Sequence, residues 1–189
     1  MQASQDPIHQ AASESWLKTY YFARAAVSIA WVLATISLAG KSSSIAAILL
    51  VFYPLWDALA NLLDATRSGG LARNRPQAFN VAVSLVVAAA VCVALPDMHH
   101  VLAVFGVWAI LSGLLQLGAG LRRRKLYGAQ WAMMLSGGQS ALAGATFVFQ
   151  AQAAAEPSIA TLTGYASFGA FYFLVSALLL TFRARRRAA

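Results

Sequence analysis

Long apolar stretches alternate with short polar connections over most of the chain. Each stretch has about twenty residues, enough to cross about 30 Å of hydrocarbon as a helix that rises about 1.5 Å per residue. Apolar and polar residues do not alternate within them as they would in the strands of a membrane barrel. The pattern therefore predicts six transmembrane helices, near residues 20–39, 45–66, 77–95, 100–121, 129–151 and 158–182.

The predicted spans divide the chain into three parts. Residues 1–19 form a cytoplasmic or interfacial segment, residues 20–182 a transmembrane domain, and residues 183–189 a basic cytoplasmic tail. The fold class is all-α, a polytopic membrane protein.

Composition supports this class of protein. Hydrophobic residues make up 60% of the chain and charged residues 11%, against about 25% charged residues in an ordinary soluble domain. The single cysteine, Cys92, excludes an intrachain disulfide and leaves no cysteine cluster for zinc. We therefore expect no cofactor.

The basic residues predict the orientation of the helices. All Lys and Arg residues except Lys41 fall on one side of the predicted membrane. By the positive-inside rule both termini are cytoplasmic, which suits a bacterial inner membrane. Nucleic-acid binding is not expected, since the clusters lie at the ends of spans and no domain is large enough for recognition. We instead expect the clusters to contact anionic lipid head groups, through Arg122, Arg123, Arg124, Lys125, Arg183, Arg185, Arg186 and Arg187.

A short motif recurs in the second, fourth and sixth spans. In each copy an aromatic residue is followed by Pro or Gly, with another aromatic residue two positions later. The copies start at Tyr53, Phe105 and Phe168. The repeated unit is a helical hairpin used three times in one orientation, which predicts a pseudo-threefold axis along the membrane normal.

The stretch from Gly106 to Gln116 resembles the short repeat of the HdeD-like membrane proteins. The resemblance extends over most of residues 20–182 and implies a bundle of two-helix units, six spans in all, with a role in acid resistance. It carries no functional residues over to this chain. The second span departs from the repeat with Pro54 in place of Gly, and with Asp57 and Asp64.

Asp57 is predicted to lie near the membrane midplane. A charge at that depth costs at least about 2.5–3.5 kcal/mol, so the carboxylate needs partners inside the protein. Asn61 lies one helical turn away on the same face, and the third span offers only Val86 and Ser84 at this depth. The other polar side chains expected in the same layer are Ser28, Ser112, Gln139, Ser140 and Tyr172.

Arg24 and Asp64 are predicted to form an ion pair near the cytoplasmic surface. Together with Asp57 they would make a polar face that runs from the midplane to the cytoplasm. Two interpretations stay open: a proton or solute pathway in which Asp57 titrates, and an aspartate that fixes helix packing.

Small residues recur on the fifth span. The spacing of Ser136, Gly137, Ser140, Ala141 and Gly144 favours close packing of helices. We expect this packing to be internal rather than between copies of the chain.

His99 and His100 follow Pro96 and Asp97 in an external connection. They would gain charge as the pH falls through about 6.5 and could sense acid. As a metal site they are weak, because two adjacent histidines have no fixed third ligand. A solvated turn is the favoured interpretation.

The residue types do not favour an enzyme. Intramembrane hydrolysis needs a Ser-His pair, two aspartates or a metal set, and the predicted spans contain no His, no Glu and one deep Asp. We expect a non-enzymatic membrane protein of stress resistance or envelope maintenance that acts through lipid, a second copy or a membrane protein partner. The alternative is a small proton-linked channel or transporter that uses Asp57.

Overall fold

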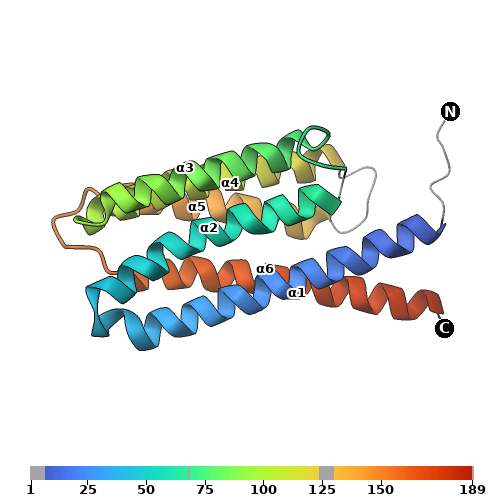
Figure 1. Cartoon of the computed structure of the whole chain (residues 1–189), viewed down its shortest axis with the longest axis horizontal. Coiled ribbons are helices and arrows are strands. Elements are labelled where there is room, and N and C mark those ends of the chain that lie inside the picture. The colour runs from blue at the N-terminus through green and yellow to red at the C-terminus, as the bar shows by residue number, and fades with distance from the viewer. Residues whose placement is uncertain (1–6, 68, 124–129, 189) are drawn as a thin grey trace.

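The computed structural model describes residues 7–67, 69–123 and 130–188, and in these residues it contains long helices and no strand (Figure 1). A short 3-10 turn, η1, covers Ala39–Lys41 between the first two helices. The helices are α1 (Pro7–Leu38), α2 (Ser43–Arg67), α3 (Arg75–Ala94), α4 (Met98–Arg123), α5 (Gln130–Gln150) and α6 (Ala160–Ala188).

The helices coincide with the six apolar runs. Most boundaries lie within two residues of the predicted ones, because turn and helix-breaking residues mark the connections. The exceptions are the outer ends of α1 and α6, which begin at Pro7 and end at Ala188. The segments at 1–19 and 183–189 thus continue the first and last helices over most of their length.

Five helices are long and apolar enough to cross a membrane, within the described residues. They are the segments Ser15–Lys41, Ser43–Arg67, Arg75–Ala94, Met98–Gly118 and Ala160–Arg186. The remaining helix, α5, has 21 residues, and its side chains are described only in part. Apolar helices of this number and length indicate an α-helical membrane protein.

The six helices form a closed ring. Each packs against its neighbours in the sequence, and α1 packs against α6 to close the circle. Contact is most extensive between α4 and α5, between α1 and α6, and between α2 and α3. The pairs α1–α2, α3–α4 and α5–α6 share less contact, so close and loose seams alternate around the ring.

The bundle has two chemically different ends. The start of α1 and the end of α6 lie together at one end (Figure 1), which also holds the connection between α2 and α3. We call this the arginine-rich end, after Arg67, Arg73, Arg75, Arg183 and Arg185. The opposite end holds the turn at Lys41 and the connection at Asp97.

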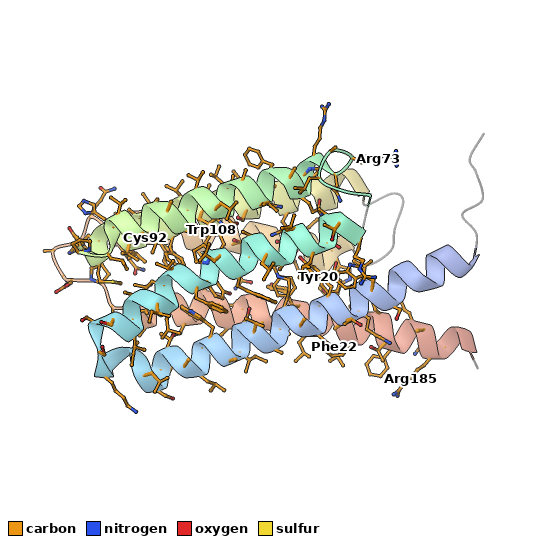
Figure 2. All side chains as sticks on the ribbon, in the orientation of Figure 1. Tyr20, Phe22, Arg73, Cys92, Trp108 and Arg185 are labelled. Atoms are coloured by element: carbon orange, nitrogen blue, oxygen red, sulfur yellow. The ribbon has the colours of Figure 1, made fainter. Side chains whose placement is uncertain are left out.

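Large side chains fill the half of the ring nearer the opposite end. Trp31, Tyr53, Trp108 and Phe105 are buried there. Each ring contacts the next in this order, with ring centroids 4.7, 6.0 and 5.6 Å apart. Figure 2 shows Trp108 in the middle of the bundle. We call these four residues the aromatic plug. Their rings lie at the centre of a core to which all six helices contribute.

Glycines allow α4 and α5 to approach closely. A Cβ added at Gly137 would lie 2.6 Å from the backbone nitrogen of Leu117, and one added at Gly113 would lie 2.6 Å from the carbonyl oxygen of Gly137. Gly106 and Gly144 meet in the same way further along the two helices. The small residues of α5 therefore serve internal packing, as their spacing led us to expect.

Candidate functional site

Arg24 on α1 and Asp57 on α2 form an ion pair in the interior of the bundle. The two side chains are 14% and 15% exposed. The predicted partner of Arg24 was Asp64, and that prediction is wrong.

The error came from the predicted start of the first span. α1 begins at Pro7 rather than at residue 20, and Arg24 lies 14 residues before the end of this helix at Leu38. Asp57 lies 14 residues after the start of α2 at Ser43. The two charges therefore sit at matching depths on antiparallel helices, and Asp64 lies too close to the arginine-rich end.

Both carboxylate oxygens of Asp57 accept hydrogen bonds. Arg24 donates to Oδ1, while Asn61 Nδ2 and Ser84 Oγ donate to Oδ2 at 3.0 and 2.8 Å. Ser84 in turn accepts a hydrogen bond from Trp108 Nε1 at 3.2 Å. Side chains from α1, α2 and α3 thus neutralise and solvate this carboxylate, which is how a charge can be kept inside a membrane protein.

Arg24 also holds α6. Its guanidinium lies 4.4 Å from the ring centroid of Phe173, a cation–π geometry, and donates to the hydroxyl of Tyr20 at 3.0 Å. Its Nε is buried and has no hydrogen-bond partner among the described residues. Arg24 is therefore the point at which α1, α2 and α6 are tied together.

Asp64 has its own partners near the arginine-rich end. It accepts hydrogen bonds from Trp16 Nε1 at 3.3 Å and from Gln77 Nε2 at 3.0 Å. The guanidinium of Arg67 lies 4.9 Å from the Trp16 ring centroid. This cluster fastens α1, at Trp16, to α2 and α3.

The other polar residues predicted near this depth make no hydrogen bond to Asp57 among the described residues. Tyr172 donates to Gln139 Oε1 at 2.8 Å, which links α6 to α5. Ser140 lies 3.0 Å from the hydroxyl of Tyr165 and donates to the carbonyl of Ala109. The Ser28 hydroxyl lies 3.4 Å from the Tyr53 hydroxyl. The Ser112 hydroxyl has no hydrogen-bond partner among the described residues.

A small pocket opens beside Arg24 at the seam between α1 and α2. Its volume is about 90 Å³. The aromatic rings of Trp16, Tyr20 and Trp56 line it together with Arg24 and Leu63. It lies on the side of Asp57 that faces the arginine-rich end, whereas the aromatic plug packs on the other side.

The two histidines lie at the start of α4. Asp97 caps the helix by accepting a hydrogen bond from the His99 backbone nitrogen at 2.8 Å. His100 Nδ1 lies 3.2 Å from the Asp97 carboxylate, and both side chains are well exposed. His99 Nδ1 lies 3.1 Å from the carbonyl oxygen of Ala151. Within the described residues no three His, Cys, Asp or Glu side chains are grouped as metal ligands would be.

The basic residues expected to contact lipid are described in part. Arg183, Arg185 and Arg186 are exposed at the end of α6. Arg124 and Lys125 lie outside the described residues. The side chains of Arg122, Arg123 and Arg187, which belong to helices, are also outside the description.

The fold and this site define a class: an α-helical membrane protein whose ring of helices is held by a buried charge pair. Comparison of the chain with protein-family models, curated proteins and solved structures finds no match. The resemblance to the HdeD-like proteins therefore stays a prediction from the repeated motif.

Proposed function

We propose that this chain is a non-enzymatic protein of the bacterial inner membrane that maintains the envelope under stress by acting on lipids or on membrane protein partners. In this proposal α5 is the sixth span, and both termini face the cytoplasm because the arginine-rich end is the positive side. The alternation of close and loose seams fits a threefold arrangement in which the loose seams lie within the three predicted hairpins and the close seams lie between them.

The hydrogen bonding of Asp57 carries the proposal. A carboxylate that relays protons must exchange partners with water or with groups that accept a proton. Here Ser84 and Asn61 take one oxygen and Arg24 the other. Beyond Ser84 the next group is the indole of Trp108, which donates a hydrogen bond and cannot accept one. The chain of polar groups ends there, against the aromatic plug.

A proton-linked transporter is the second candidate, favoured by the pocket beside Arg24. That pocket brings a small space to the charge pair from the arginine-rich side. A transporter would also need an opening through the aromatic plug. The pocket alone fits an entry from one side, which is why transport is the weaker of the two functions.

Proton flux into liposomes separates the two candidates. We expect liposomes that contain the wild-type protein to leak protons no faster than empty liposomes, across about pH 4 to pH 8, a range that spans the ordinary pKa values of carboxyl and imidazole groups. Asp57→Asn and the exposed-carboxylate control Asp97→Asn should give the same rate. Flux in the wild type and in Asp97→Asn that disappears in a folded Asp57→Asn protein would establish transport instead.

The envelope role is tested in the native cell. Cells that lack the protein should take up a membrane-impermeant dye faster than wild-type cells after acid challenge, and expression of the Asp97→Asn protein should restore the barrier. Equal dye uptake with and without the protein would contradict a role in envelope maintenance.

A further inference from the structure

The loose seam between α3 and α4 contains an apolar groove on the outside of the ring. Its volume is about 470 Å³. Ala82, Val83 and Val86 of α3 form one wall, and Val104, Val107 and Leu111 of α4 form the other. In the part of the chain that the structure describes, no residue with a polar side chain lines it. Any occupant of the groove is therefore apolar.

A basic residue, Arg75, lies on the same face of α3 as the groove, closer to the arginine-rich end. Arg75 begins the helix, Phe79 follows one turn later and Val83 one turn after that, a spacing that places all three on one face. Phe79 is 49% exposed and Val86 is 67% exposed. An apolar stripe thus leads from an exposed arginine into the groove.

Arg73 and Arg75 have no carboxylate partner in the described part of the chain. Asp57 pairs with Arg24 and Asp97 lies against His100, while Asp64 is engaged by Trp16 and Gln77. Both arginines are exposed at the arginine-rich end. They are free to bind an anion at the membrane surface.

The distances suit one lipid molecule. Ala82 lies seven residues after Arg75, about 10 Å along the helix, and Val86 lies about 16 Å along it at about 1.5 Å per residue. One leaflet contributes about half of the 30 Å of hydrocarbon. An acyl chain that starts at the level of Arg75 therefore reaches the groove with about the last third of its length and ends near Val86.

We infer that the α3–α4 groove is a binding site for one anionic phospholipid, with its head group at Arg73 and Arg75 and an acyl chain between α3 and α4. The inference rests on the proposed function, since it supplies the lipid on which that function acts. A second copy of the chain fits the groove less well. Gly106 and Gly113, which would let another backbone approach α4, are already used against α5.

Selectivity must come from the head group. An acyl chain gains little by leaving bulk lipid for a protein groove, because both environments are apolar. A basic side chain at the membrane surface raises the affinity for an anionic lipid about fivefold, because it contributes about 1 kcal/mol. The site should therefore prefer phosphatidylglycerol over phosphatidylcholine with the same acyl chains, by about fivefold or more.

Native mass spectrometry of the full-length protein in detergent, titrated with each of these two lipids, tests the site. We expect Arg75→Gln to weaken binding of phosphatidylglycerol about fivefold and to leave phosphatidylcholine unchanged. Lys41→Gln, which removes the same charge at the opposite end, should bind phosphatidylglycerol as the wild type does. Equal weakening in Arg75→Gln and Lys41→Gln would overturn the assignment of the head group.

A steric pair of variants tests the acyl chain. Ala82→Phe fills the groove and should reduce binding of both lipids, whereas Ala89→Phe, an exposed position on α3 outside the groove, should not. If Ala82→Phe fails to fold, Val86→Trp blocks the same groove from an exposed position. Wild-type binding in the folded blocking variant would overturn the proposal. So would a wild-type dimer that dissociates on blocking, because the groove would then hold a second copy.

These outcomes are separate from those of the envelope experiment. A protein that protects the envelope but binds neither lipid in the groove would keep the proposed function and lose this site. A protein that binds phosphatidylglycerol here but leaves dye uptake unchanged would keep the site and lose the function.

Discussion

An Asp57→Leu protein is expected to lose about 3–5 kcal/mol of stability, the largest effect of any single substitution considered for this chain. The substitution leaves the Arg24 guanidinium inside the bundle with no negative charge beside it, and it also removes the acceptor of Ser84 and Asn61. The measurement is unfolding in mixed detergent micelles, followed by tryptophan fluorescence.

The double variant Arg24→Met, Asp57→Leu separates the charge pair from simple loss of contacts. We expect it to recover most of the lost stability, because no charge is then left buried, and the double-mutant cycle should show strong coupling. His100→Leu removes a well-exposed contact with the Asp97 carboxylate and should change stability by less than about 1 kcal/mol. Additive losses at positions 24 and 57 would contradict the role of the pair.

Adding one methyl group at Gly137 is expected to destabilise the protein by about 1–3 kcal/mol. The Gly137→Ala side chain would lie 2.6 Å from the backbone nitrogen of Leu117 and 2.7 Å from the carbonyl oxygen of Gly113. Backbone atoms cannot turn aside as a side chain can, so α4 and α5 must separate along their closest seam. Thermal unfolding in detergent measures the effect.

The next residue provides the matched control. Gly138 has no atom within 4 Å of its Cβ position, so Gly138→Ala adds the same group in open space. It should be neutral, or it should stabilise α5 by up to about 1 kcal/mol because alanine favours the helix over glycine. Equal unfolding temperatures for Gly137→Ala and Gly138→Ala would show that close α4–α5 packing is not needed for stability.

The sequence predicts where the helices lie better than it predicts which faces meet. Apolar length and turn residues place all six helices, since both depend on the chain locally. The runs are apolar on most sides, as helices in lipid can be, so no polar face marks the side that packs. The α1–α6 contact that closes the ring joins helices far apart in the sequence, so no local sequence pattern predicts it.

The candidate site was predictable in its central residue and less so in its partners. Asp57 stands out because a deep carboxylate is rare and costly. Its pairing with Arg24 was missed because α1 begins at Pro7 rather than at the predicted start, residue 20, so Arg24 lies well inside the helix and not near its start. Ser84 lay at the right depth, but only the contact between α2 and α3 brings it to Asp57.

The Arg24–Asp57 pair has a consequence for the synthesis of the protein. Each charge alone opposes entry of its helix into the bilayer, whereas α1 and α2, joined by the short turn at Lys41, can enter together with the charges already paired. Phe173 lies on α6, which is synthesised after α1 and α2, and it reaches Arg24 only when the ring closes. The α1–α2 hairpin can therefore enter as a neutral unit, and the same arginine is then available to receive α6.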